Sequence, residues 1–334
     1  MSVSGADLAT LAAELRERLP EATTEQVPFA ELSTYRIGGP VAVLVRVYSV
    51  DALAVVAAAT RRLQPRLLVI GRGSNLLMSD AGFSGLVVLL EGDFESVELP
   101  ERERDDGGDA PHDVRSGGAV PLPVLARRTA GAGLAGLEFY VGIPGSVGGA
   151  VRMNAGGHGR ETVEVLQRAW VLDLLDAHGP AAPVERNLSE LELGYRSSNL
   201  RPSEVVCAAE FTVTTDDVSA CEARVTDIVR WRREHQPGGQ NAGSVFRNPP
   251  GDSAGRIIEA AGLKGLRVGG AVVSEKHANF FQAEPGATAS DVRDLVTEVR
   301  RRVAHETGVE LVPELHIVGD DVGENSDRDE REDA

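Results

Sequence analysis

Apolar residues recur with two different spacings along the chain, and the two spacings predict two kinds of element. Short aliphatic runs bounded by Gly, Pro or polar clusters predict strands near 41–47, 67–70, 86–90, 163–173, 205–214 and 311–318. Longer stretches with apolar residues three or four apart predict helices over 51–63, 120–131, 217–234, 254–261 and 290–307. Because the two kinds are mixed, we expect an α+β fold.

Polar residues at the starts of these stretches predict where the helices begin. Asp51 and Ser290 stand at the starts of two helical patterns, and each is expected to be the N-cap. Near the N terminus, four leucines at helical spacing predict a short amphipathic helix: Leu8, Leu11, Leu15 and Leu19.

Length and charge limit the classes of function. The 334 residues leave room for two or three domains with full cores. The net charge of −17 argues against a nucleic-acid partner, because such proteins need a basic surface. Residues 320–334 carry eight acidic and two basic side chains, so we expect a disordered acidic tail. A second acidic run, 98–113, is expected to be a loop between two strands.

Targeting and membrane signals are weak in this sequence. The first twenty residues have no basic region followed by an apolar core, and no apolar run reaches membrane-spanning length. Cys207 and Cys221 lack metal-ligand spacing and are interpreted as small core residues. We therefore expect a cytoplasmic protein without a metal site or membrane insertion, and a monomer.

Two glycine-rich segments indicate a ligand with both a phosphate and a flat ring. Gly71-Arg72-Gly73-Ser74-Asn75 follows a predicted strand and can present successive backbone N–H groups to an anion. It lacks the third glycine and following helix of a Rossmann fingerprint. The second segment, 142–150, is a structural turn or a surface on which a planar group presses. Together they suit a dinucleotide such as FAD.

A third segment, Gly243 to Pro249, contains a serine in a Gly-, Pro- and Asn-rich loop. The Ser244 hydroxyl can give or take a proton, and Arg247 and Asn248 can hold a charged substrate. The alternative is a serine that hydrogen-bonds its own loop. A hydrolase nucleophile is disfavoured because the Gly-x-Ser-x-Gly turn is absent.

The order of these and other motifs resembles the UDP-N-acetylenolpyruvoylglucosamine reductase family over about residues 25–319. The resemblance is carried by segments beginning at Thr34-Tyr35-Arg36-Ile37-Gly38-Gly39, Gly71, Gly136-Leu137-Glu138-Phe139, Ile143, Asn154-Ala155-Gly156, Tyr195-Arg196-Ser197-Ser198, Gly243, Ala261-Gly262-Leu263-Lys264-Gly265, Ser274-Glu275-Lys276-His277-Ala278-Asn279-Phe280 and Pro313-Glu314-Leu315. The short spacing between Arg196 and Ser244 resembles the branch without an extra tyrosine-bearing loop. Arg247 and His158 depart from the commonest residues, lysine and tyrosine, at their positions.

The resemblance implies a domain organisation. It predicts an N-terminal helix (1–20), an FAD-binding domain of the vanillyl-alcohol-oxidase type (21–214, in two subdomains split near 76–85) and an α/β substrate-binding domain (215–319). The final strand would return to the FAD domain.

The resemblance also implies a reaction and its residues. NADPH would reduce non-covalently bound FAD, which would reduce an enolpyruvyl ether of a UDP-sugar in peptidoglycan synthesis. Arg196 would stabilise charge at the substrate carboxylate, Ser244 would protonate carbon, and Glu314 would orient a water or polarise the carboxylate. Residues expected at FAD are Gly71, Arg72, Gly73, Ser74, Asn75, Leu76, Ile143, Pro144, Gly145, Ser146, Gly148, Gly149, Ala150 and Asn154; residues expected at the substrate are Tyr195, Arg247, Asn248, Lys264 and His277.

Two other functions remain open on the sequence alone. One is an FAD-dependent oxidase of a small alcohol or sugar, with the same fold. The other is a catalytically silent flavin- or nucleotide-binding protein. The presence of Arg196, Ser244 and Glu314 together disfavours the silent protein, and Ser244 disfavours the oxidase. The diphosphate of a nucleotide-sugar substrate would need cations, and Arg232, Arg233 and Arg247 are available; for each, a solvated surface role is the alternative.

Overall fold

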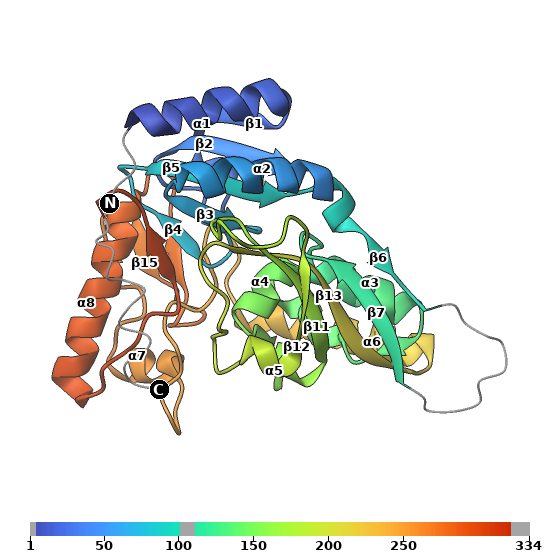
Figure 1. The fold of residues 1–334 in the computed structure, drawn as a ribbon. Helices are drawn as coiled ribbons and strands as arrows, with labels where there is room; N and C mark the ends of the chain where they lie inside the picture. Colours follow the sequence, from blue (N-terminus) through green and yellow to red (C-terminus); the bar gives the residue numbers. More distant parts are fainter. Residues whose placement is uncertain (1–4, 101–110, 322–334) are drawn as a thin grey trace. The chain divides into compact units, whose positions relative to one another are not determined.

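The structure, a computed structural model, describes residues 5–100 and 111–321. Within these ranges the chain forms two compact units (Figure 1). Of the described residues, the first unit comprises 5–25, 43–72, 85–100 and 111–232, and the second comprises 26–42, 73–84 and 233–321. The helix over Val218–His235 packs into the core of the first unit.

The described part of the first unit contains two larger sheets and a two-stranded one. A four-stranded sheet, which lies mainly in this unit, has the order β1 (Thr23–Pro28), β2 (Pro40–Val47), β5 (Phe83–Leu90), β3 (Leu67–Ile70). A larger antiparallel sheet has the order β12 (Val184–Asn187), β11 (Leu166–Asp173), β13 (Glu204–Thr215), β7 (Pro111–Gly117), β6 (Val97–Glu98), and β8 (Leu134–Ala135) pairs with β13.

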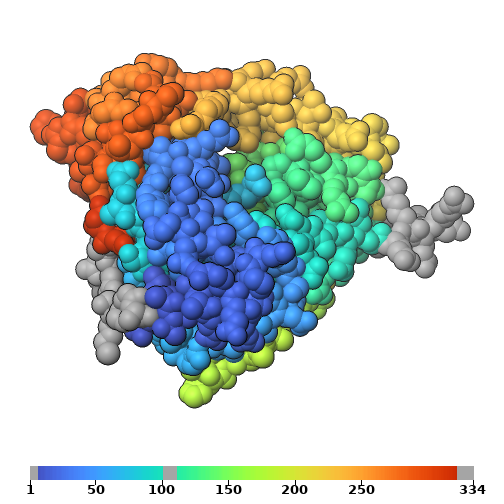
Figure 2. Space-filling model, turned by 90° about the horizontal axis from the view of Figure 1, so that it is seen from above, coloured from blue at the N-terminus to red at the C-terminus, as the bar shows by residue number. Residues whose placement is uncertain are grey.

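Helices complete the first unit. They are α1 (Gly5–Arg18), α2 (Val50–Leu63), α3 (Leu122–Gly131), α4 (Val147–Arg152), α5 (Leu188–Leu191) and α6 (Val218–His235). Helix α1 packs against α2, and both are on the face seen in Figure 2, in blue. A core that includes Phe139, Tyr140 and Phe211 fills the space between the larger sheet and helices α3, α4 and α6. A short hairpin, β9 (Gly156–Gly157) and β10 (Arg160–Glu161), follows α4.

The second unit has its own core, in which the rings of Phe246 and Phe281 meet edge to face at 5.8 Å. Its strands are β4 (Leu76–Met78), β14 (Arg267–Val268), β15 (Ala271–Val273), β16 (Phe281–Ala283) and β17 (His316–Val318), and its helices are α7 (Ala254–Ala260) and α8 (Ala289–Thr307). Strand β17 pairs in parallel with β4, so the last strand lies beside the segment that follows Asn75. Among the described residues, no helix is long and apolar enough to cross a membrane.

The predicted helices and strands are confirmed in kind, while several ends are not where we expected them. The N-cap of α2 is Ser49, whose hydroxyl accepts from the Ala52 N–H, and not Asp51, which lies in the first turn. The N-cap of α8 is Thr288, not Ser290, because Thr288 forms a capping box with Asp291.

The acidic segments also differ from expectation. Pro111 to Asp113 belong to β7 and Glu98 to β6, because these two strands pair, so the loop expected over 98–113 is shorter; residues 101–110 lie outside the described ranges. In the predicted tail, Asp320 accepts hydrogen bonds from Ser84 and Asp321 pairs with Arg293. Residues 322–334 lie outside the described ranges.

Candidate functional site

Arg196 lies in a tight turn of the first unit. The Gly194 and Ser197 backbones exchange two hydrogen bonds, of 3.1 and 3.2 Å, and Arg196 between them has a φ of +55°. A left-handed backbone is uncommon for a non-glycine residue, and such strain is concentrated at functional sites. The turn therefore fixes the direction in which the Arg196 side chain leaves the backbone.

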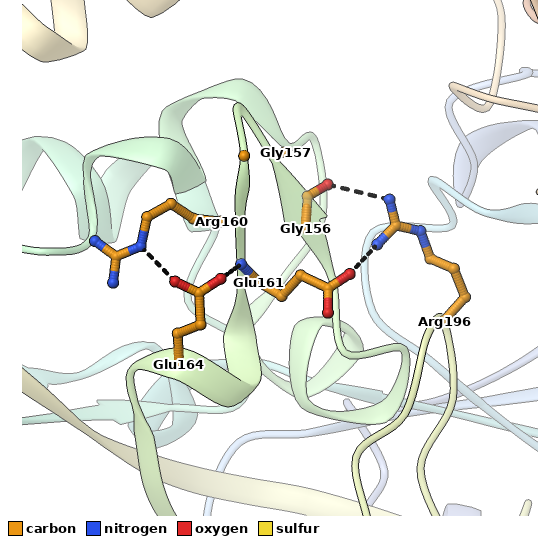
Figure 3. A pocket seen from close by; sticks show the side chains of 7 residues that line it. Gly156, Gly157, Arg160, Glu161, Glu164 and Arg196 are labelled. Carbon is orange, nitrogen blue, oxygen red and sulfur yellow. Dashed lines mark hydrogen bonds and ion pairs between the residues drawn. The ribbon is translucent and has the colours of Figure 1, made fainter. Parts of the chain in front are cut away.

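The guanidinium of Arg196 lines an open pocket of about 450 Å³ (Figure 3). The rest of the pocket is formed by the hairpin β9–β10 and its flanks, with three glycines and three charged side chains: Gly156, Gly157, Gly159, Arg160, Glu161 and Glu164. Nη1 of Arg196 lies 3.6 Å from a carboxylate oxygen of Glu161, and Nη2 donates to the Gly156 carbonyl at 3.4 Å. The pocket thus places the Arg196 guanidinium, held by Glu161 and Gly156, beside a surface formed by glycine residues.

Ser244 belongs to the second unit, in a segment held on both sides. On one side the backbone N–H of Val245 donates to the Asn279 carbonyl at 2.9 Å. On the other side the N–H of Glu314 donates to the Val245 carbonyl at 2.8 Å. Ser244 itself is half-buried. Across residues 5–100 and 111–321, its hydroxyl makes no hydrogen bond to the protein, which removes the simplest structural role for this serine.

Asn279 fixes this segment more strongly than any residue that we singled out from the sequence. Its side chain is buried, its Oδ1 accepts from the Phe246 N–H at 2.9 Å, and its Nδ2 donates to the Phe246 carbonyl at 2.8 Å. The sequence reasoning missed this residue because it acts across 33 positions of chain. The only available signal was its place within the Ser274–Phe280 motif.

Glu314 is placed next to the Ser244 segment but not as we predicted. It precedes β17 instead of lying within the final strand, and it is partly exposed. Its carbonyl accepts from Nδ2 of Asn75 at 3.0 Å, which connects it to the first glycine-rich segment. The structure therefore brings together Glu314, the Ser244 segment and Asn75 within the second unit, and it places Arg196 in the first.

The predicted substrate residues lie in different surroundings. Lys264 pairs with Glu259 at 2.7 Å. Burial and the nearby Lys264 lower the pKa of His277, whose Nδ1 accepts from the Asn279 N–H at 3.2 Å.

Tyr195 is exposed, and its ring lies 5.1 Å from the Arg196 guanidinium carbon. Arg247 is partly buried; its backbone N–H donates to the Val312 carbonyl. The Asn248 Oδ1 accepts from the Ala254 N–H at the start of α7.

The two glycine-rich segments differ in how their amides are used. The N–H groups of Val147 and Gly148 donate to the carbonyls of Val120 and Gly118, and Ser146 caps α4 by accepting from Gly149. A Cβ on Gly148 would lie 3.2 Å from the Gly118 carbonyl oxygen, so this glycine permits close packing. The second segment is therefore partly the beginning of a helix, where we expected only a loop.

The first segment, in contrast, has backbone N–H groups that can bind a ligand. In the described part of the chain, the backbone N–H groups of Arg72, Gly73, Ser74 and Asn75 donate to no protein acceptor, although the carbonyls of Gly73 and Asn75 accept from Thr34 and His316. The φ of Gly73 is +57°, and a Cβ there would lie 2.2 Å from the Leu32 carbonyl oxygen. A loop fixed through its carbonyls with its N–H groups directed elsewhere fits an anionic group.

Comparison with known proteins decides the family. The profile of the C-terminal domain of UDP-N-acetylenolpyruvoylglucosamine reductase matches residues 235–318, and an FAD binding domain profile matches residues 41–179. The UDP-N-acetylenolpyruvoylglucosamine reductase of Alkalilimnicola ehrlichii is 40% identical over 296 residues, 88% of this chain and 93% of the relative. The chain belongs to the UDP-N-acetylenolpyruvoylglucosamine reductase family.

Other members of the reductase family support the same assignment. The reductase of Legionella pneumophila is 39% identical over 295 residues, 88% of this chain and 91% of the relative. The crystal structure of the reductase from Thermus caldophilus matches with a TM-score of 0.72 and 35% identity, and covers 87% of this chain and 97% of that chain. The chain is thus an FAD-dependent oxidoreductase, with an FAD-binding domain followed by the C-terminal domain of the reductase family.

Proposed function

We propose that this protein reduces UDP-N-acetylglucosamine enolpyruvate to UDP-N-acetylmuramate, with NADPH as the source of hydride, in peptidoglycan precursor synthesis. Membership of the reductase family and the FAD-binding domain support this proposal. Bound FAD would accept a hydride from NADPH and would provide it to the terminal carbon of the enol ether. The backbone N–H groups from Arg72 to Asn75 would hold its diphosphate.

Two tasks are left to the protein. Negative charge develops on the carbon next to the substrate carboxylate, and that carbon must then receive a proton. Arg196 would hold the carboxylate and stabilise the charge, because a guanidinium is permanently charged and matches a carboxylate with two parallel hydrogen bonds. Its fixed backbone turn and its ion pair with Glu161 support this role, since a preorganised cation needs little rearrangement as charge develops.

Ser244 would donate the proton to carbon. A serine hydroxyl is a weak acid, but a carbanion is basic enough to accept its proton. The observation that carries the proposal is the state of Ser244: its backbone is fixed on both sides, while in the described part of the chain its hydroxyl makes no hydrogen bond to the protein. Glu314, joined to Val245 through its backbone, would orient the water that restores the proton.

Purified protein tests the proposal directly. It should be yellow, should release FAD on denaturation, and under anaerobic conditions should oxidise NADPH beyond one equivalent per flavin only when the enolpyruvyl nucleotide is added. A colourless protein, or a yellow protein that ignores this nucleotide, would contradict the proposal. Formation of hydrogen peroxide with small alcohols or sugars would instead identify an oxidase.

A further inference from the structure

The pocket around Arg196 contains two carboxylates that have different partners. Glu161 faces Arg196, with its carboxylate 3.6 Å from Nη1. Glu164 faces Arg160, with a hydrogen bond of 2.8 Å, and also accepts from the Glu161 backbone N–H at 2.8 Å. That N–H and the Arg160 guanidinium hold the pKa of Glu164 below its ordinary value. Figure 3 shows the two glutamates on opposite sides of β10, so one hairpin separates two ion pairs.

A buried asparagine fixes the glutamate that faces Arg196. Asn154 is 1% exposed, and its Nδ2 donates both to Oε2 of Glu161 at 3.1 Å and to the Gly194 carbonyl at 2.9 Å. Its Oδ1 accepts from the Val163 N–H at 2.9 Å. One side chain thus connects the carboxylate that pairs with Arg196 to the turn that carries Arg196. These three hydrogen bonds use most of the capacity of an amide group, which favours a positioning role for Asn154 over contact with the cofactor.

Gly156 lets these groups approach each other. A Cβ at this position would lie 2.9 Å from Cγ of Glu161, 3.1 Å from Nη1 of Arg196 and 2.8 Å from the Arg160 carbonyl oxygen. Any side chain would therefore push Glu161 or Arg196 away. The Gly156 carbonyl also accepts from Nη2 of Arg196, so the same residue contacts the guanidinium through its backbone.

We propose that Glu161, held by Asn154, is a positioning residue for Arg196. It sets the orientation of the guanidinium before substrate binds, so that Arg196 does not have to change rotamer to pair with the enolpyruvyl carboxylate. This inference rests on the proposed function, because it assigns Arg196 to the substrate carboxylate. Its physical basis is general: a small misplacement of a charged group that stabilises a transition state slows the reaction strongly.

Two glutamine substitutions in the FAD-loaded full chain test the proposal. Glu161→Gln keeps the shape and an acceptor for Asn154 but removes the charge that faces Arg196. Glu164→Gln is the matched control, because it removes one charge from the same pocket without touching Arg196. We expect Glu161→Gln to slow flavin reoxidation by saturating enolpyruvyl nucleotide by about 10- to 100-fold, as loss of an orienting partner typically does. Flavin reduction by NADPH should be unchanged.

The Glu164→Gln control and the double variant with Arg196→Lys distinguish a positioning role of Glu161 from a structural one. Glu164→Gln should change reoxidation by less than about fivefold, as expected for an exposed ion pair. Adding Glu161→Gln to Arg196→Lys should cause little further loss, because Glu161 acts through Arg196. Equal effects of the two glutamine variants, additive effects with Arg196→Lys, or parallel losses in both half-reactions would overturn the proposal. If Glu161→Gln does not fold, Glu161→Asp keeps the charge but withdraws the carboxylate from Arg196, and it should slow reoxidation more than Glu164→Asp does.

A signal from Arg196 separates this inference from the proposed function. In protein labelled with ¹⁵N-arginine, the side-chain resonance of Arg196 is identified by its absence in Arg196→Lys. It should shift or broaden in Glu161→Gln and stay in place in Glu164→Gln, without any substrate. An unmoved resonance would contradict positioning by Glu161. If the resonance moves but the wild-type enzyme does not react with the enolpyruvyl nucleotide, the proposed function fails while the positioning remains.

Discussion

Glu314 donates its backbone N–H to the carbonyl oxygen of Val245 at 2.8 Å, directly after Ser244. Ser244 and Glu314, which are 70 positions apart and which we expected in catalysis, are therefore linked through the backbone of Val245, the residue next to Ser244. Backbone hydrogen bonds do not depend on side-chain identity, so either side chain can be replaced while the segment stays in place. Because the backbone sets their positions and the side chains would do the chemistry, Ser244 and Glu314 are both suitable for substitution.

Replacement of Ser244 by alanine should slow the reaction with the enolpyruvyl nucleotide and leave the stability of the fold almost unchanged. Because its hydroxyl makes no hydrogen bond to the described protein, the free energy of unfolding should change by less than about 0.5 kcal/mol. Flavin reduction by NADPH should persist, while reoxidation by the enolpyruvyl nucleotide should slow by roughly 10²–10⁴-fold through loss of the proton donor. Stopped-flow absorbance of the flavin measures both half-reactions.

The contrasting control is Ser253→Ala. The Ser253 hydroxyl caps α7 by accepting from the Arg256 N–H at 3.3 Å, so its loss should lower stability by about 1 kcal/mol and leave both half-reactions intact. A Ser244→Ala variant with normal reoxidation, or with equal loss of both half-reactions, would exclude Ser244 as the proton donor.

Asn279 should be a main determinant of stability in the second unit. Asn279→Ala would leave the buried N–H and carbonyl of Phe246 without partners, which costs about 1–3 kcal/mol for each group. The urea midpoint of unfolding should fall accordingly. Gln282→Ala is the comparison: it removes one exposed hydrogen bond, to the Gly238 carbonyl, and should have little effect on the midpoint. Similar midpoints for the two variants would contradict the clamping role of Asn279.

The contrast between Ser244 and Asn279 shows what the sequence can and cannot reveal. Local periodicity predicted the strand Leu67–Ile70 and the helix at Ala254 because each depends on neighbours in the chain. The Ser244 motif was recognisable because its residues are contiguous. Asn279 acts on Phe246 across a pairing that periodicity does not specify.

The same limit applies to the pocket and to the helix ends. The role proposed for Glu161 depends on Asn154 and Arg196, which the fold brings beside it. No local sequence pattern distinguishes Glu161 from Glu164. Both N-caps were misplaced by two residues, because Ser, Thr and Asp are all good caps. The backbone turn then decides which oxygen reaches the amide, as with Ser49 instead of Asp51.

His277 should make stability depend on pH. Its pKa is lowered from 6.5 by burial and by Lys264, with a smaller opposing effect of Glu259. The folded state therefore binds this proton less readily than the unfolded state, and the contribution of neutral His277 is present above the unfolded pKa of about 6.5 and lost as pH falls through the lower folded value.

The variant His277→Asn isolates this contribution, because an asparagine oxygen can still accept from the Asn279 N–H while it does not titrate. We expect the loss of unfolding free energy between pH 7.5 and about pH 5.5 to be smaller in His277→Asn than in the wild type, measured by urea unfolding at each pH. His158 also has a pKa lowered by burial and by Arg232, so both proteins retain that second dependence. Identical pH profiles would show that His277 does not control this loss.

The contact between Gly71 and Ser146 provides a test of the packing between the two glycine-rich segments. A Cβ on Gly71 would lie 2.3 Å from Oγ of Ser146, the hydroxyl that caps α4. Gly71→Ala should therefore destabilise the protein by roughly 1–3 kcal/mol, as overpacking does. Ser146→Ala alone should cost about 1 kcal/mol through loss of the cap. In the double variant the oxygen that causes the clash is gone, so the two effects should be less than additive.

Gly131→Ala is the matched control for this experiment, because a Cβ there meets nothing within 4 Å at the end of α3. It should leave stability unchanged or slightly raised, since alanine is the better helix former. Thermal unfolding of the four proteins of the cycle and of Gly131→Ala measures these differences. Full additivity of Gly71→Ala and Ser146→Ala would mean that the two residues do not meet. A loss in Gly131→Ala as large as in Gly71→Ala would mean that the clash is not the cause.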